Sequence, residues 1–151
     1  MNTKISIRTF RNSDYDRAYG IWRGTEGIGL SEADSREGIR LFLRRNRGLS
    51  RVAVAGNRVI AAVLCGHDGR RGYLHHLAVA RKWRRMGIGT SLVTSCLEGL
   101  RKEGIPKCNL FLFARNKKGR AFWKRVGWDV RSDIRLAQCG TTAPVGDRTQ
   151  C

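Results

Sequence analysis

The sequence predicts a mixed α/β domain whose central, mostly antiparallel sheet contains one splayed parallel pair and carries helices on both faces. Two observations predict this class. Apolar runs separated by tight glycine turns between residues 51 and 79 are typical of antiparallel hairpins. A strand, a helix of about 15 residues and another strand then follow one another between residues 73 and 113, which is the usual right-handed crossover between parallel strands. Where two parallel strands diverge, a slot opens that can accept an extended ligand arm.

The first third of the chain predicts one strand and two helices. Residues 5–9 alternate apolar and polar side chains, as a half-buried strand does. A helix with apolar side chains on one face follows, and Asn12 or Ser13 can cap it. The glycine-rich segment 24–30 ends this helix, and a second short helix begins near Ser35.

The remaining elements follow one another without an internal repeat or a linker. The predicted elements are strands over 51–55, 58–66 and 73–79, a helix ending at Gly104, a strand over 108–113, a short helix over 119–126 and a final strand over 128–136. We therefore expect residues 1–139 to form a single domain. The segment 140–151 has few apolar residues, so we expect it to be a loosely held tail.

Length and composition exclude several classes of protein. A chain of 151 residues fits one domain with a real core. No run of 18 apolar residues exists, and the N-terminus has no apolar signal region, so the sequence favours a cytoplasmic protein with no membrane partner. The five cysteines are widely spaced, with no CxxC or Cys/His pairing, so we expect no metal.

The charge balance is strongly basic, with 30 Lys and Arg against 12 Asp and Glu and a net charge of +18. Nucleic acid, an anionic cofactor and an acidic protein surface are all compatible partners. The basic residues are spread along the whole chain rather than gathered in one block. Nucleic-acid binding is therefore possible but not favoured as the main function.

The segment 74–104 contains the most informative pattern. An apolar strand runs into a basic turn, Arg84-x-x-Gly87-x-Gly89, and a helix follows at once. The first backbone N–H groups of a helix have no intrahelical partner and lie at the positive end of its dipole, so they bind anions. Because glycine has no Cβ, a pyrophosphate can approach the main chain, and Arg81 and Lys82 add positive charge. A dinucleotide fold is disfavoured, because the third glycine and the downstream acid are missing.

Four motifs of this sequence, taken in their order and spacing, resemble the acetyl-CoA signature of the GNAT superfamily of N-acetyltransferases. They are Leu77-Ala78-Val79, Arg84 to Gly89, Asn116, and Ala121 to Trp128. The resemblance covers roughly residues 5–136 and implies an acyl-CoA N-acyltransferase fold with acetyl-CoA as cosubstrate and an amine as acceptor. The cofactor-binding residues it implies are Leu77, Val79, Arg84, Arg85, Met86, Gly87, Ile88, Gly89, Thr90, Asn116 and Trp123.

The candidate catalytic residues are two adjacent histidines. Direct acetyl transfer needs an aligned thioester, a base that takes a proton from the attacking amine, and a hydrogen-bond donor for the oxyanion. The backbone amide of Leu77 or of Val79 could be that donor. His75 and His76 lie mid-strand, and their usual pKa suits proton removal at neutral pH. Because strand side chains alternate, only one is expected to face the slot. Local similarity to the arylalkylamine N-acetyltransferase branch favours His75, although either histidine could be a packed strand residue.

Two features bear on acid catalysis and on the acceptor. Many relatives of the resembled superfamily have a tyrosine that protonates the thiolate at the position of Trp123, and an indole cannot do this. Four acids lie close together, at Glu26, Glu32, Asp34 and Glu37, where they can steer a cationic amine or cap helices. The acceptor is expected to be a small amine, an amino acid or a protein amine.

Two alternatives to catalysis are a basic nucleic-acid-binding module and an acyl-CoA sensor without chemistry. Salt-dependent binding of DNA or RNA without binding of acetyl-CoA would favour the first. Binding of acetyl-CoA without transfer to any amine would favour the second. Either a monomer or a homodimer is compatible with the sequence.

Overall fold

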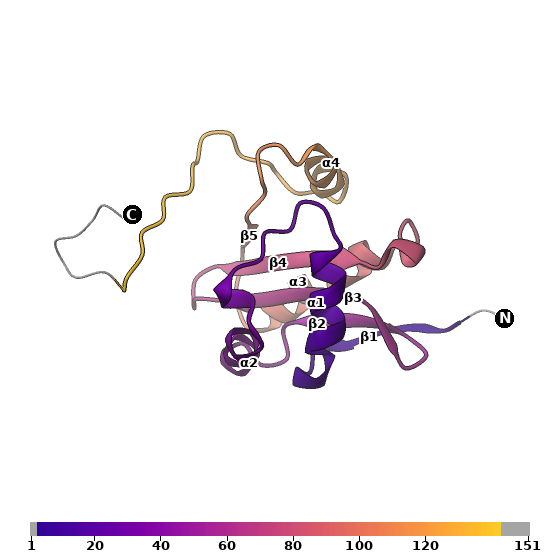
Figure 1. Cartoon of the computed structure of the whole chain (residues 1–151). Helices are drawn as coiled ribbons and strands as arrows, with labels where there is room; N and C mark the ends of the chain where they lie inside the picture. The colour runs from indigo at the N-terminus through magenta and orange to yellow at the C-terminus, as the bar shows by residue number, and fades with distance from the viewer. Residues whose placement is uncertain (1–2, 143–151) are drawn as a thin grey trace. The chain divides into compact units, whose positions relative to one another are not determined.

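The structure of this protein is a computed structural model that describes residues 3–142 (Figure 1). The chain divides into two compact units, residues 1–116 and residues 117–151, which are described separately below. The first unit contains the sheet and three of the helices. No helix of the described residues is long and apolar enough to cross a membrane.

The first unit is built on a five-stranded mixed sheet with the strands in sequence order. The strands are β1 (Ile5–Thr9), β2 (Arg51–Ala55), β3 (Arg58–His67), β4 (Gly72–Val79) and β5 (Cys108–Leu110). The pairs β1–β2, β2–β3 and β3–β4 are antiparallel, and β4–β5 is parallel. The mixed sheet predicted from the sequence and its single parallel pair are therefore confirmed.

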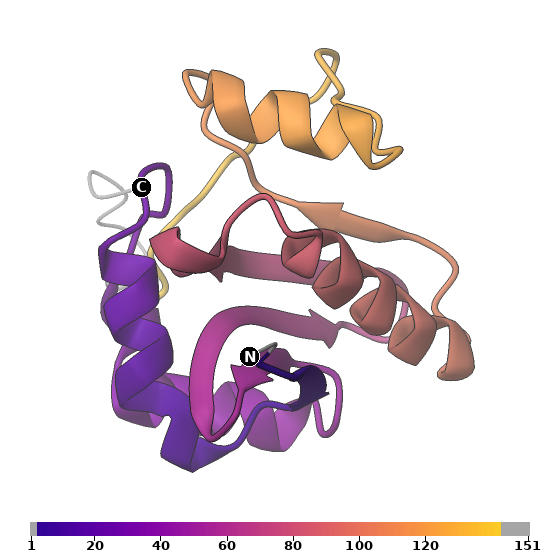
Figure 2. The same cartoon turned by 90° about the vertical axis from the view of Figure 1, so that its right-hand side faces the viewer.

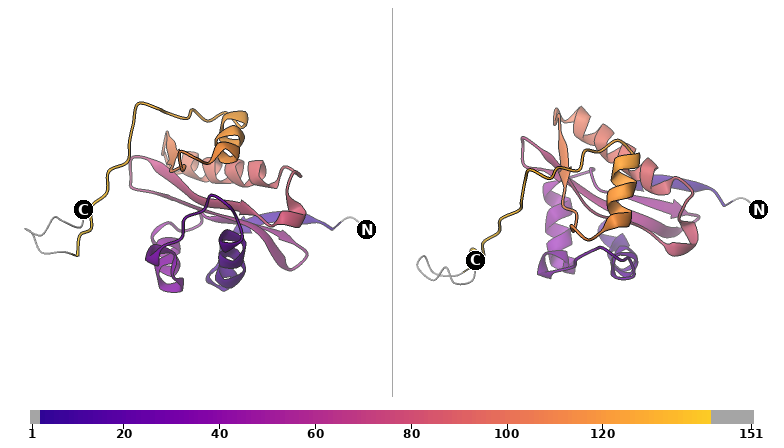
Figure 3. Two further views of the ribbon diagram at one scale, coloured as in Figure 1. Left: turned by 45° about the horizontal axis from the view of Figure 1, so that its top comes forward. Right: turned by 90° about the horizontal axis from the view of Figure 1, so that it is seen from above.

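Helices cover both faces of this sheet (Figures 2 and 3). The helices α1 (Tyr15–Arg23) and α2 (Arg36–Arg45) lie on one face, and α3 (Ile88–Lys102) lies on the other, against β2, β3 and β4. Short 3₁₀ turns precede each of them, over 12–14, 32–34 and 81–83. The predicted start of α2 is confirmed, because the Oγ of Ser35 accepts the N–H of Gly38 at 3.1 Å.

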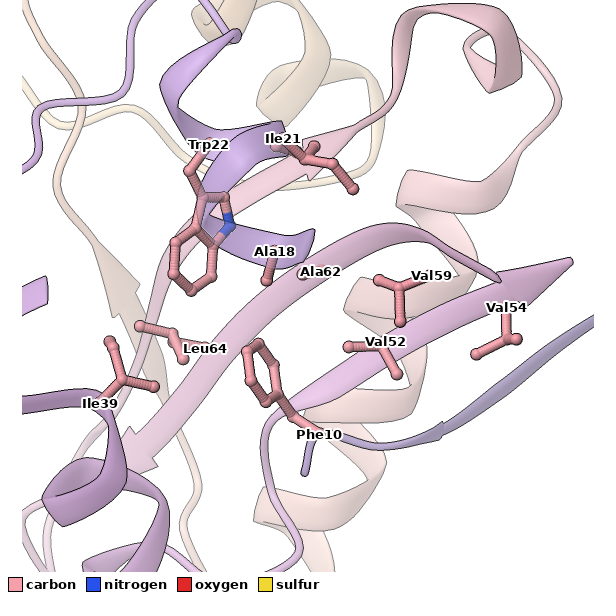
Figure 4. Packing of buried hydrophobic residues seen from close by; sticks show 11 residues of the cluster. Phe10, Ala18, Ile21, Trp22, Ile39, Val52, Val54, Val59, Ala62 and Leu64 are labelled. Atoms are coloured by element: carbon pink, nitrogen blue, oxygen red, sulfur yellow. The ribbon is translucent and has the colours of Figure 1, made fainter. Parts of the chain in front are cut away.

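One hydrophobic core of the first unit lies between α1, α2 and the sheet (Figure 4). Trp22 of α1 is fully buried and packs against Phe10, with ring centroids 6.0 Å apart. Val52 and Leu64 contribute from the sheet. Full burial of one such side chain stabilises the fold by about 1.5–3 kcal/mol. This core holds α1 beside β3 and β4, where the candidate site lies.

The second unit contains α4 (Lys117–Arg125), which corresponds to the predicted short helix. Trp123 of this helix is 8% exposed and packs on Trp128, with ring centroids 4.8 Å apart. The backbone N–H of Trp128 also donates to the carbonyl of Trp123 at 2.9 Å. These contacts fold the chain back directly after the helix.

The predicted strand over 128–136 is wrong. From residue 126 to residue 142 the chain has neither helix nor strand. The alternating apolar side chains that suggested a strand are exposed, at 39% for Val130, 57% for Ile134 and 60% for Leu136. Alternation predicts a strand only where a partner supplies the ladder of hydrogen bonds. β5 is also shorter than predicted, ending at Leu110 rather than at residue 113. Most of the predicted tail, residues 143–151, lies outside the described residues.

Candidate active site

The candidate site begins where the two parallel strands separate. β4 and β5 pair only at Gly72 with Cys108, Tyr73 with Asn109 and Leu74 with Leu110. Within the described residues, β4 has no β5 partner from His75 onward. The edge of β4 beyond that point is thus open in the way that the sequence predicted.

β4 contains a bulge at the two histidines. Ala62 pairs with Ala78, and Leu64 pairs with His75, so His76 and Leu77 together lie opposite a single residue of β3. His76 adopts a left-handed conformation with φ of 57°. A bulge of this kind breaks the ladder, bends the strand and redirects side chains. Non-glycine residues rarely adopt this conformation outside such features.

The bulge places both histidines on the face covered by α1 and α2. The ring of His76 lies 5.3 Å from Trp22 of α1, and that of His75 lies 6.0 Å from Phe42 of α2. The two imidazole centroids are 6.4 Å apart. The alternation expected of a regular strand is therefore broken at these two residues, because the bulge adds one residue.

His76 is paired with a buried carboxylate. Its Nε2 lies 2.8 Å from Oδ1 of Asp34, whose side chain is 9% exposed. The other oxygen, Oδ2, accepts the backbone N–H of Ser31 at 3.0 Å, and the Asp34 carbonyl accepts the hydroxyl of Tyr15 at 2.6 Å. Because an ionised carboxylate only accepts hydrogen bonds, the Nε2 of His76 carries the hydrogen. In the neutral ring, Nδ1 is then the acceptor.

Asp34 was not predicted as part of the site. It was grouped with three other acids that can steer a cationic amine or cap helices, and in the structure it is buried, closes a capping box and is bonded to His76. Glu37 is also occupied, since it forms an ion pair with Arg40. The spacing Ser31-x-x-Asp34 is a capping-box pattern, and the structure forms that box around the 3₁₀ turn. This pattern was the available signal that Asp34 points inward.

His75 lies in an aromatic environment. Its ring is parallel to that of Tyr73, 6.3 Å away, and lies 6.1 Å from Phe111, whose side chain is 59% exposed. Burial lowers the pKa of His75 below its usual 6.5, His76 lowers it further, and Asp34 acts in the opposite direction. Burial and the neighbouring His76 therefore favour the neutral imidazole, which is the form that can accept a proton.

The predicted anion loop joins β4 to α3. Arg85 and Gly87 have left-handed φ values of 63° and 78°, and Gly87 is the N-cap of the helix. The first helical hydrogen bond runs from the N–H of Ser91 to the carbonyl of Gly87 at 3.0 Å. The backbone N–H groups of residues 88–90 therefore have no acceptor within the helix, and no side chain caps them. A Cβ on Gly87 would meet nothing within 4 Å, so backbone conformation is what requires glycine there.

Arg84 ties this loop to the strand. Its Nε donates to the carbonyl of Val79 at 2.9 Å. One of the main-chain acceptors predicted to contact the cofactor is therefore already occupied by the protein. Met86, in the same loop, is 58% exposed.

The loop between α1 and the next 3₁₀ turn packs against the chain that follows β5. A Cβ on Gly27 would lie 2.6 Å from Nδ2 of Asn116, and one on Gly29 would lie 2.9 Å from Cζ of Phe113. Glycine at these two positions is what allows the close approach. Asn116 is thus placed beside the α1 loop, while Trp123 belongs to the second unit.

The described residues contain no group of three or more His, Cys, Asp or Glu that could hold a metal ion. An open strand edge, a histidine at its first unpaired position and a row of uncapped helix amides lie within one unit. The arrangement suits an extended ligand with an anionic group at one end and a reacting group beside the histidines.

Comparison with known proteins agrees with this arrangement. The model of the acetyltransferase (GNAT) family matches residues 13–128. The chain belongs to the GNAT acetyltransferase family. It is therefore an acetyl-CoA-dependent N-acetyltransferase that acts on a primary amine, and the two non-catalytic alternatives are not supported.

The curated relatives include N-alpha-acetyltransferase 30 of Schizosaccharomyces pombe, which is 31% identical over 104 residues, covering 66% of this chain and 69% of the relative. The Homo sapiens N-alpha-acetyltransferase 30 is equally identical over 104 residues and the same 66% of this chain, but the match covers 29% of that longer protein.

Among solved structures, Ard1 from Thermoplasma volcanium gives a TM-score of 0.75 at 19% identity, covering 85% of this chain and 84% of that one. The PaiA N-acetyltransferase from Thermoplasma acidophilum in complex with coenzyme A gives 0.70 at 19% identity, covering 85% and 91%. At this identity the likeness concerns the fold, and it confirms the fold class predicted from the sequence.

Proposed function

We propose that this acetyltransferase transfers the acetyl group to the α-amino group of a peptide or protein N-terminus. The curated relatives that the chain matches are N-alpha-acetyltransferases. A histidine base supports the same acceptor on chemical grounds, as follows.

A weak base suffices for an α-amine but not for a lysine side chain. With a pKa near 7.7–8.0, about one α-amino group in ten is already neutral at pH 7, compared with about one lysine in 2,500. An imidazole is a poor acceptor for the proton of a lysine ammonium, whose usual pKa is far higher, and burial lowers the pKa of His75 further. His75 can accept the proton that the α-amine releases as it attacks the thioester.

In this proposal the diphosphate of coenzyme A binds the amides of residues 88–90. Gly87 and Gly89 leave room for it, and the guanidinium of Arg85 adds charge from the exposed side of the loop. The pantetheine arm runs along the open edge of β4 and pairs with the main chain of Leu77 as an added strand would, whereas the carbonyl of Val79 already accepts the Nε of Arg84.

The bulge supplies the reacting centre. The amide of Leu77, released from regular pairing, is the donor for the oxyanion of the tetrahedral intermediate. His75 is the general base, and it stands at the first residue of β4 without a β5 partner. His76 is a positioning residue, because its bond to Asp34 holds the bulge in one conformation.

The acceptor enters beside exposed aromatic side chains. Phe111 and Phe113 are 59% and 47% exposed, and Phe111 stacks on both Tyr73 and His75. These exposed aromatic rings favour an acceptor whose first residues carry apolar side chains, because such side chains bury apolar area against the rings on binding.

The observation that carries the proposal is the position of His75 at the point where β4 and β5 separate. A thiol-release assay with acetyl-CoA tests it with two peptides of one sequence, both containing an internal lysine. One has a free N-terminus and the other a blocked N-terminus. We expect turnover only with the free N-terminus. Equal turnover with both peptides would contradict the choice of acceptor and leave the acetyltransferase activity standing.

A further inference from the structure

A concave surface separate from the candidate site lies on the first unit, formed by the turn after β1 and the C-terminal half of α2. It is an open pocket of about 310 Å³. Four arginines line it together with Phe10, Asn12 and Leu43. We call these four residues, Arg11, Arg40, Arg44 and Arg47, the arginine pocket. None of them belongs to β4, to the loop over 84–87 or to α3.

The four positive charges of the arginine pocket exceed the negative charge beside them. Glu37 forms an ion pair with Arg40 at 2.6 Å, and Arg44 also lowers the pKa of Glu37. Asp14 accepts two hydrogen bonds from Arg8, at 2.7 and 3.0 Å, and the backbone N–H of Arg11 at 2.8 Å. The side chains of Arg44 and Arg47 are exposed and make no hydrogen bond or ion pair within residues 3–142.

We propose that the arginine pocket binds the phosphates of a nucleic acid backbone. Guanidinium groups donate in a planar fork that matches phosphate oxygens, and a concave wall of them concentrates the field. Arg40 and Arg44 are one helical turn apart, so they point along one side of α2, about 6 Å apart along its axis. A polyanion can therefore be contacted at more than one phosphate.

The rest of the chain favours a long polyanion over a small anion. The net charge of +18 arises from basic residues along the whole sequence, so a backbone with one charge per nucleotide meets positive potential beyond the pocket. A membrane surface is less well matched, because its binding needs apolar anchors beside the charges. The apolar residues that line this pocket do not supply them, since Phe10 is 4% exposed and Leu43 is half-buried.

The test is the binding of a fluorescein-labelled single-stranded RNA to the full chain, measured by fluorescence polarisation over a series of salt concentrations. The variant is Arg44→Gln with Arg47→Gln. The matched control is Arg70→Gln with Arg71→Gln, which removes the same charge from the turn between β3 and β4. Arg11→Gln alone is a second pocket variant.

The expected loss follows from counterion release. Each phosphate contact on a single strand contributes about −0.7 to the slope of log K against log salt, so two lost contacts reduce affinity about 25-fold at about 0.1 M salt and flatten the slope by about 1.4. The control pair should lose less than about 3-fold, since it removes only diffuse charge. Melting temperature and thiol release should be unchanged in all variants.

Equal losses in the pocket and control variants would overturn the proposal, because the binding would then depend on net charge alone. No binding of RNA, or equal competition by polyglutamate, would also overturn it. So would a pocket-dependent binding of vesicles containing anionic lipid without binding of RNA.

Discussion

The substitution Asp34→Asn probes the buried pair at the bulge. It keeps the size of the side chain but removes its charge and one of its two acceptor positions. In the native protein Oδ1 lies 2.8 Å from the Nε2 of His76, and Oδ2 accepts the N–H of Ser31 at 3.0 Å. An amide has one oxygen and one NH₂ group, so one of these two donors loses its acceptor.

The expected cost follows from burial. The Asp34 side chain is 9% exposed and that of His76 is 17% exposed, so water does not replace the lost bond. Hydrogen bonds to charged groups contribute about 1.5–3 kcal/mol, and a buried donor without an acceptor costs about 1–3 kcal/mol. We expect the free energy of unfolding at pH 7 to fall by about 2 kcal/mol.

The same substitution has an electrostatic consequence for His75. Asp34 raises the pKa of His75 against the effects of burial and His76, so its removal lowers that pKa further. The acidic limb of kcat against pH should therefore move to lower pH, which loss of stability alone would not cause.

Urea unfolding and the pH dependence of thiol release check both effects. Asp16→Asn is the control, since Asp16 is exposed and forms an ion pair with Arg36 at the surface, where such pairs contribute about 0–1 kcal/mol. A cost below about 0.5 kcal/mol for Asp34→Asn, or an acidic limb that moves to higher pH, would refute the reasoning.

Three further predictions follow from individual residues. His75→Ala should reduce kcat about 100-fold or more and remove the acidic limb of the profile of kcat against pH. The control His67→Ala, which removes a histidine outside the site, should leave kcat and the profile unchanged. An acidic limb retained in His75→Ala would exclude His75 as the base. Gly72→Ala should destabilise the protein by about 1–3 kcal/mol in urea unfolding, because its Cβ would lie 2.5 Å from Leu100, and a neutral result would show that this side chain moves aside freely. Gly20→Ala should stabilise it by about 0.5–1 kcal/mol, because α1 leaves open space there; a loss of stability would contradict the packing of α1.

Local sequence signals predicted the parts of the fold that depend on local physics. Gly56-Asn57 turns the hairpin between β2 and β3, and Gly56 has a left-handed φ of 62°. Apolar spacing identified α3, and Gly87 of the glycine turn is its N-cap. The splayed parallel pair followed from the length of the crossover between β4 and β5.

The parts that were missed depend on contacts between distant segments. A bulge adds one residue to a ladder, and nothing in the local pattern of His75 and His76 reveals which residue of β3 lies opposite them. The bond from His76 to Asp34 joins residues 42 positions apart, which alternation and helical spacing do not encode. Segment 128–136 alternates apolar and polar residues as a strand does but forms no strand, because strand pairing also requires a neighbouring strand.

The central claim is that the amides at the start of α3 bind the diphosphate of acetyl-CoA, and calorimetric titration of acetyl-CoA at moderate ionic strength tests it most directly. Gly87→Glu places a carboxylate in that position, and Gly69→Glu is its matched control, because Gly69 also has a left-handed φ, of 92°, and open space around it. We predict measurable binding to the native protein, a loss of about 10-fold or more with Gly87→Glu, and no change with Gly69→Glu. No heat from the native protein, or equal affinity in all three proteins, would contradict the account.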